Sequence, residues 1–184
     1  EKRQPLALSA LLQASAALFA GNPNFRDPGA DVTTFLYDRL RGLLRERGFA
    51  QNEVEAVIAQ QPDVLDNIVE RLQAVQAFAA LPEAEALAAA NKRITNILKK
   101  ADVAGAAVQS GLLRESAEQG LHAAMNSLRP TVEQAYAQGD FAATLRGLAH
   151  LRSDVDAFFN DVMVMAEDAS LRTNRIALLS ELHG

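Results

Sequence analysis

Apolar residues recur at steps of three and four along this chain, and the stretch that follows Val32 shows the pattern clearly. Up to Gly48 the apolar positions include Phe35, Leu36 and Leu40. This spacing places side chains on one face of an α-helix. Composition points the same way, because alanine and leucine supply 60 of the 90 apolar residues while the β-branched valine and isoleucine supply 17. The sequence therefore predicts an all-α fold, a bundle of helices.

Glycine and proline divide the first 80 residues into four predicted helices. The first spans about residues 6–20. The second has Asp31 as its N-cap and ends at Gly48, and the third has Asn52 as its N-cap and ends before Pro62. A fourth helix follows, with its apolar face formed by Leu65, Ile68, Val69, Leu72 and Val75.

The remaining residues form a second predicted region of helices. Pro82 suits the first turn of a helix, and a loop is expected at 102–111. Pro130 either begins a new helix or kinks an existing one, and Gly139 and Asp140 form the next break. The predicted helices cover 82–101, 113–128, 141–151, 154–165 and a last stretch from Ser170, which serves as its N-cap.

Sequence patterns typical of catalysis or metal binding are missing. The three histidines, His122, His150 and His183, lie far apart, and no pair has the spacing that places two metal ligands on one helix face. There is no glycine-rich phosphate loop, no G-x-S-x-G motif and no cysteine. We therefore expect this chain to contribute no catalytic residue and to hold no metal ion or cofactor.

The balance of charges limits the partners of the chain. It has 18 Lys and Arg residues against 23 Asp and Glu residues, a net charge of −5, so contact with nucleic acid must be local. Residues 6–20 are too few to span a bilayer, and the absence of cysteine is typical of the cytoplasm. Because the sequence opens at Glu1 without methionine, we expect it to be part of a longer protein.

The helix predicted at 82–101 carries the most informative polar face. Its apolar stripe includes Ile94 and Leu98, and polar side chains lie opposite. Cations beside hydrogen-bonding side chains suit phosphate neutralisation together with contacts to base edges. The alternative is a solvated helix face whose last lysines lie near the negative end of the helix dipole. The candidate RNA-binding residues are Lys92, Asn96 and Lys99, flanked by Arg93, Thr95 and Lys100.

Near the C-terminus, two groups of residues have a structural interpretation. Phe158 and Phe159 alternate with aliphatic residues at helical spacing, which favours core packing over stacking on bases. Arg175 falls among leucines, where an unpaired charge is costly, and Asp168 is its expected partner. Asp168, Arg172 and Arg175 thus form a candidate ion network, and RNA contact by Arg172 is the less favoured alternative.

A second basic stretch lies in the first region. Arg39, Arg41, Arg45 and Arg47 share one predicted helix with only two acidic residues to offset them. This face can contact an RNA backbone or an acidic neighbour, although a solvated face is the default interpretation.

Several runs of the second region resemble a known RNA-binding family. Residues 88–101, AAANKRITNILKKA, resemble the opening helix of the DALR-type anticodon-binding domain, in particular that of the β subunits of bacterial glycyl-tRNA synthetases. Segments within 112–141 resemble its second and third helices. The stretches 151–168 and 171–175 give the most specific match, because many positions agree without a gap. Residues 1–80 resemble the preceding helical part of the same subunits.

The resemblance implies a DALR-like anticodon-binding domain at 81–184, shortened at its C-terminus, after a small helical linker region at 1–80. It implies a non-catalytic part of a β subunit that binds the anticodon region of glycine tRNA. The aminoacylation site, with its ATP and magnesium, would belong to the α subunit. The expected partners are glycine tRNA, the α subunit and the remainder of the β subunit, with no DNA and no membrane.

One observation keeps an alternative open. Residues 81–184 hold 10 Lys and Arg residues against 13 acidic ones, so RNA binding by this region alone should be weak. The alternative function is a helical scaffold that mediates contacts between domains or subunits without touching RNA.

Overall fold

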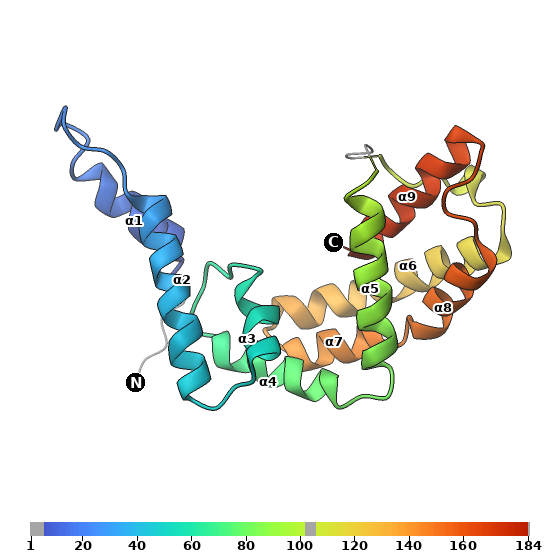
Figure 1. Ribbon diagram of the computed structural model, residues 1–184, viewed down its shortest axis with the longest axis horizontal. Helices are drawn as coiled ribbons and strands as arrows, with labels where there is room; N and C mark the ends of the chain where they lie inside the picture. Colours follow the sequence, from blue (N-terminus) through green and yellow to red (C-terminus); the bar gives the residue numbers. More distant parts are fainter. Residues whose placement is uncertain (1–5, 102–105, 184) are drawn as a thin grey trace. The chain divides into compact units, whose positions relative to one another are not determined.

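The chain is α-helical in a computed structural model that describes residues 6–101 and 106–183. The described residues form no β-strand, and their one isolated bridge joins Ala7 to Val64. This confirms the all-α prediction. The chain divides into two compact units, Glu1–Ala77 and Phe78–Gly184, which are described separately below (Figure 1).

Unit 1 is a small helical bundle with its own core. Helices α1 and α2 pack together, as do α2 and α3. The side chains of Leu44, Val54, Ile58 and Leu72 are fully or almost fully buried at its centre. Burial of apolar side chains is the main force that holds helices of this length together. The helices are α1 Leu8–Ala17, α2 Gly29–Glu46, α3 Gln51–Ile58 and α4 Ile68–Ala79, the last of which extends two residues past the unit boundary.

The starts of α2 and α3 differ from the predictions. Asp31 lies inside the first turn of α2, and Asp27 instead accepts a 2.8 Å hydrogen bond from the N–H of Gly29. Asn52 lies inside α3, where Glu53 reaches back and accepts a 2.8 Å bond from the N–H of Ala50. In both cases the helix begins earlier than predicted because a different carboxylate satisfies the free N–H groups.

A long-range contact fixes the start of α1. Asp63 accepts hydrogen bonds from the backbone N–H of Ser9 at 2.7 Å and from its hydroxyl at 2.6 Å. These bonds lower the pKa of Asp63. Gly48 ends α2 as predicted, with a φ of 94° that side chains disfavour.

Unit 2 is built around α6. This helix packs against α7, α8 and α9, and α5 packs against α8 and α9. Ile94, Leu121, Phe158, Leu178 and Leu179 form the centre of its core. The elements are α5 Ala84–Leu98, a 3₁₀ turn at Ser110–Leu112, α6 Ser116–Ala137, α7 Phe141–Ala149, α8 Arg152–Asp161 and α9 Ala169–His183 (Figure 1).

Pro82 lies before its predicted helix, whereas Pro130 follows the second of its two predicted alternatives, a place inside an existing helix. Pro82 precedes the N-cap residue Glu83, so α5 begins two residues later than the sequence indicated. Pro130 lies inside α6, which continues through it, and no new helix begins there. Gly139 and Asp140 do form the break that follows, because Asp140 accepts a 2.9 Å bond from the N–H of Ala143 and caps α7. Of the loop expected at 102–111, residues 102–105 lie outside the described part of the chain.

The stretch after α8 corrects a further prediction. The helix ends at Asp161, and Val162 is extended, so 162–165 do not continue the helix. Val162 and Val164 are buried, whereas Met163 is 72 % exposed and Met165 is 60 % exposed. The two valine side chains pack on the core, and the two methionine side chains lie outside it, in a stretch that turns at Val164 and Met165. The exposed methionines therefore face outward from a backbone that the core holds.

Candidate nucleic-acid interface

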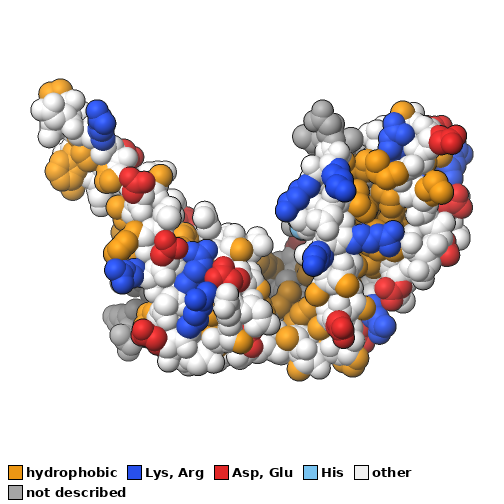
Figure 2. Space-filling model, viewed as in Figure 1, with side chains coloured by type: hydrophobic (Ala, Val, Ile, Leu, Met, Phe, Trp, Pro, Cys, Tyr) orange, Lys and Arg blue, Asp and Glu red, His pale blue; other side chains and the backbone are white. Residues whose placement is uncertain are grey.

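The polar face of α5 forms one side of a shallow groove of about 460 Å³. Four of the six candidate RNA-binding residues line it. Figure 2 shows Lys and Arg side chains over α5 beside a hydrophobic area. The lining residues, called the α5 groove below, are Ala89, Lys92, Arg93, Asn96, Ile97, Lys100 and Met165.

Helical periodicity explains why these side chains share a face. Ile94 is 2 % exposed and Leu98 packs against the same core, which turns Lys92 and Asn96 outward. The end of α5 adds Lys100, whose backbone N–H donates to the carbonyl of Ile97 in a tighter 3₁₀-type turn. At about 100° per residue, Lys100 falls between Asn96 and Arg93 around the helix axis, whereas Lys99 falls on the far side of Lys92. Lys100 therefore lines the groove, and Lys99 does not.

Two candidate residues lie outside the groove. Lys99 is exposed at the C-cap of α5 but is not a lining residue. Thr95 donates its hydroxyl to the carbonyl of Asn91 at 2.9 Å, and this internal bond occupies its donor. The structure thus assembles Lys92, Arg93, Asn96 and Lys100 as one group.

Arg93 has a neighbour that the sequence did not reveal. Its guanidinium carbon lies 4.2 Å from the ring centre of Phe159, within the range of a cation–π contact. Phe159 is half-buried and meets the fully buried Phe158 edge to face, with ring centres 5.6 Å apart. Core packing is confirmed for Phe158, while Phe159 has one side on the core and the other under Arg93. No local pattern pairs residues 66 positions apart.

The electrostatics of the α5 groove favour an anion. None of its lining residues is Asp or Glu. Within residues 6–101 and 106–183, no carboxylate lies within salt-bridge distance of Lys92, Arg93 or Lys100. Unneutralised cations on one face attract phosphate groups.

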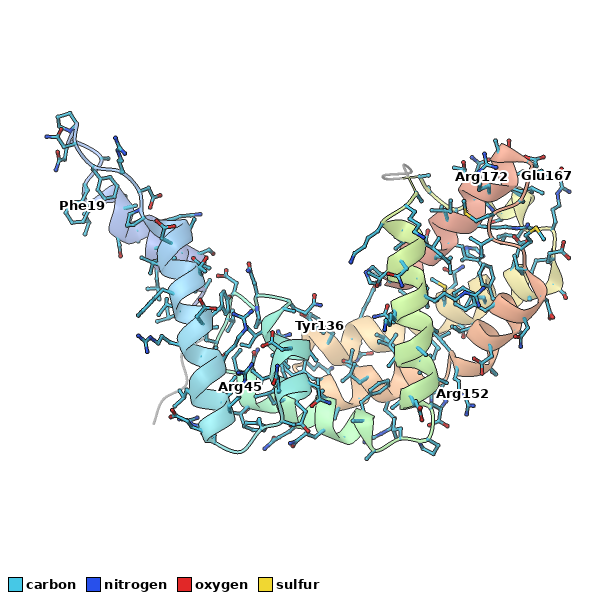
Figure 3. The ribbon with its side chains drawn as sticks, in the orientation of Figure 1. Phe19, Arg45, Tyr136, Arg152, Glu167 and Arg172 are labelled. Atoms are coloured by element: carbon cyan, nitrogen blue, oxygen red, sulfur yellow. The ribbon has the colours of Figure 1, made fainter. Side chains whose placement is uncertain are left out.

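Two arginines of α9 hold the segment that carries Met165. Arg175 donates to the carbonyl of Met163 at 2.9 Å, and Arg172 donates to the carbonyls of Ala166 at 2.7 Å and Glu167 at 3.3 Å. Figure 3 shows Arg172 beside Glu167. These bonds fix the side of the groove that faces α5.

The partner of Arg175 is a correction to the sequence analysis. Arg175 is buried, as its place among leucines predicted, but it pairs with Glu118 at 2.6 Å and with Glu115 at 3.8 Å. Asp168 instead caps α9 by accepting hydrogen bonds from the N–H groups of Ser170 and Leu171. The predicted cap, Ser170, is therefore a donor in this cap. The network of Asp168, Arg172 and Arg175 is replaced by one centred on Glu118.

Glu118 is fully buried, and burial by itself raises the pKa of its carboxyl group. The effects that lower this pKa outweigh the effect of burial. The hydrogen bond from Arg175, the backbone N–H groups of Glu115 and Arg114, and the charge of Arg175 together lower the pKa below its ordinary value of 4.5. Glu118 is therefore ionised in the folded chain at neutral pH.

Two of the four arginines of the basic stretch of α2 are neutralised within unit 1. Glu55 of α3 accepts from Arg41 at 3.3 Å and from Arg45 at 3.2 Å, and Asp38 pairs with Arg41 at 2.7 Å. Arg45 is labelled in Figure 3. Arg39 lies 5.1 Å from the ring centre of Phe35. The acidic neighbour considered for these arginines thus belongs to the same chain.

The described part of the chain offers neither a metal site nor a membrane span. No three His, Asp or Glu side chains gather there as a metal site would require. None of the helices in residues 6–101 and 106–183 combines the length and apolarity of a membrane span.

Comparison with known proteins gives a consistent result. Residues 87–183 match the family described as DALR anticodon binding domain. Over 184 residues the chain is 57 % identical to the Glycine–tRNA ligase beta subunit of Ralstonia nicotianae and 50 % identical to that of Dechloromonas aromatica. It is 52 % identical over 183 residues to that of Paracidovorax citrulli. In each case all of the chain is covered, but it spans only 26 % of the relative.

The family match covers more than half of the chain and includes nearly all of α5 together with α6 to α9. All residues of the α5 groove lie within it. On this basis, the chain belongs to the DALR anticodon-binding domain family.

Proposed function

We propose that the chain binds transfer RNA in the α5 groove, as the anticodon-recognition part of the β subunit of a two-subunit glycine–tRNA ligase. One observation carries this function most directly. In a chain of net charge −5, the groove gathers Lys92, Arg93 and Lys100 around the amide of Asn96 without a lining carboxylate. The family match and the names of the relatives supply the class of RNA and its amino acid.

The lysines and the asparagine of the groove have different roles in RNA recognition. The lysines neutralise backbone phosphates, which contributes affinity for any RNA sequence. The amide of Asn96 has both a donor and an acceptor, so it suits a contact with a base edge. Affinity and sequence preference therefore depend on different side chains.

The wider assembly follows from the same proposal. Glycine is attached to its tRNA at the α-subunit site, which uses ATP and magnesium, and this chain supports the reaction by holding the anticodon region. The α subunit and the remainder of the β subunit are its protein partners. By itself the chain should show neither glycine-dependent pyrophosphate exchange nor tRNA charging.

The test of this function compares neighbouring lysines. In a Lys92→Glu/Lys100→Glu variant, affinity for glycine tRNA should fall, and the slope of log affinity against log salt should flatten by about 1.4–1.8, the loss of two phosphate contacts. Lys99→Glu is the matched control, because Lys99 is exposed next to Lys100 but lies outside the groove. Fluorescence anisotropy with labelled tRNA at several salt concentrations measures both quantities.

A second variant addresses the anticodon. Asn96→Ala should reduce the preference for glycine anticodons over others and leave the salt slope nearly unchanged, because no charge is lost. Equal affinities of parent and variant for both kinds of tRNA would remove Asn96 from the site.

The scaffold alternative has its own supporting feature. A second groove of about 490 Å³, whose exposed lining surface is mainly apolar, lies between α6, α7 and the end of α9. Exposed Tyr136 and Leu148 line it. Such a surface suits contact with protein. If the Lys92→Glu/Lys100→Glu variant keeps its tRNA affinity while Leu148→Asp impairs association with the α subunit, the scaffold function replaces ours.

A further inference from the structure

We propose that Arg93 and Phe159 form a stacking platform that holds one unpaired nucleobase of the RNA in the α5 groove. This inference rests on the proposed function and specifies which part of the RNA the groove accepts. The guanidinium of Arg93 lies 4.2 Å from the ring centre of Phe159. Arg93 lines the groove and Phe159 does not. The guanidinium therefore separates the aromatic ring from the groove.

This arrangement leaves the guanidinium available to a ligand. Among the described residues, no carboxylate and no hydrogen-bond acceptor is recorded for Arg93, whose side chain is exposed. Its contact with Phe159 holds the side chain in place without using its donors. Guanidinium planes of this kind stack on unpaired RNA bases, and their edges remain free for hydrogen bonds.

Met165 supplies an apolar surface on the opposite side of the groove. Its side chain is 60 % exposed and lines the groove, although an exposed methionine gains nothing for the core. A thioether side chain is flexible and polarisable, so it adapts to the flat face of an aromatic ring. The backbone on either side of Met165 is held by Arg175 and Arg172. The side chain of Met165 can thus adapt to a base, while the backbone of its segment stays fixed.

The size of the groove and the position of its lysines fit a single strand. Its volume of about 460 Å³ is within the range of roughly 300–1,000 Å³ that is usual for small-molecule sites. Lys92 and Lys100 are eight positions apart, or about 12 Å along a helix, which is more than two turns. Each can meet a different phosphate of a strand whose base enters between them, next to Asn96.

An unpaired base is required because paired bases offer no free face. In a duplex the bases are stacked on one another, and sequence-specific RNA recognition mostly involves loops and ends. The ligand class is therefore a looped-out or loop base with its two flanking phosphates.

The test uses two conservative substitutions that separate shape from charge. Arg93→Lys keeps the charge but removes the planar group, and Phe159→Leu keeps apolar bulk but removes the ring. The probe is the anticodon stem-loop of a glycine tRNA that carries a fluorescent purine analogue at one loop position at a time. Stacking quenches such an analogue, so binding to the parent chain should quench it at one position.

Both variants should lose this quenching and bind the stem-loop about 5- to 150-fold more weakly, the usual effect of losing one stacked base. The salt slope of Arg93→Lys should equal that of the parent, because no charge is lost. Arg146→Lys, at an exposed position of α7, is the control. Circular dichroism melting identifies any loss of folding in Phe159→Leu, and Arg93→Lys then decides alone.

Different results would overturn the two proposals separately. If Arg93→Lys binds and quenches like the parent, Arg93 acts only as a charge and there is no platform. If a stem duplex without a loop competes as well as the stem-loop, no unpaired base is bound. If the Lys92→Glu/Lys100→Glu variant also retains full affinity, the proposed function itself fails.

Discussion

Arg175 donates a 2.6 Å hydrogen bond from its Nε atom to Oε1 of Glu118, although 57 residues separate them along the chain. Oε2 of Glu118 accepts from the backbone N–H groups of Arg114 and Glu115, just before α6. A fourth bond runs from Arg175 to the carbonyl of Met163. One buried pair therefore joins the start of α6, the middle of α9 and the segment beside the α5 groove.

Removal of one side chain of the buried Arg175–Glu118 pair should destabilise unit 2 strongly. Arg175→Met leaves Glu118 buried without its counter-charge, and we expect a loss of about 3–5 kcal/mol in the free energy of unfolding. Urea denaturation followed by circular dichroism measures the loss. Arg152→Met, which removes an exposed pair with Asp156, should cost less than about 1 kcal/mol. Equal costs for the two variants would show that the buried pair has no special role.

The stability of unit 2 should depend on pH through Glu118. The pKa of this carboxyl group is lowered by folding, so its contribution is fully present above the unfolded value near 4.5 and is lost as pH falls through the lower folded value. Urea midpoints of the parent and of Glu118→Gln should therefore differ at neutral pH and converge in acid. A constant difference down to about pH 3 would contradict this assignment.

The two adjacent phenylalanines should differ in their effect on stability. Phe158 is fully buried, and Phe158→Ala should cost about 3–5 kcal/mol because it leaves a cavity. Phe159 is half-buried beneath Arg93, so Phe159→Ala should cost about 1–2 kcal/mol in lost burial and cation–π energy. Thermal melting of both variants tests the order, and a larger cost for Phe159→Ala would refute the burial described here.

Two glycines of unit 1 should respond oppositely to alanine. Gly48 has a φ of 94°, and Gly48→Ala should destabilise unit 1 by about 1–2 kcal/mol through backbone strain. Gly42 lies inside α2 with open space around its missing side chain. Gly42→Ala should raise stability by about 0.5–1 kcal/mol, because glycine weakens a helix interior. Opposite shifts of the urea midpoint are the expected result.

Local pattern predicted the helices of this chain well and their long-range partners poorly. The place of Arg175 among leucines indicated a buried charge in need of a counter-ion, and that was correct. The nearby Asp168 was the wrong choice because free N–H groups at the start of α9 already use its carboxylate. Only the packing of α6 against α9 brings Glu118 within reach.

The candidate site shows the same limit. The helical period grouped Lys99 with Lys92 and Asn96, but the groove lies toward Arg93 and Ile97, so Lys100 lines it and Lys99 does not. Phe159 and Met165 lie on later segments, and no spacing within α5 points to them. The sequence therefore identified the helix that carries the site. The residues on the opposite side of the groove could be identified only from the folded structure.

Pro130 interrupts the backbone hydrogen bonds of α6, although the helix continues through it. Proline has no N–H, so the carbonyl of Asn126 receives no hydrogen bond from it. All the buried residues of α6, such as Leu121 and Met125, precede Pro130, and the remainder of the helix lies beside α7. With a missing bond between them, the two halves need not open together. Amide hydrogens after Pro130 should thus exchange with solvent through local opening, while those before it report unfolding of the whole unit.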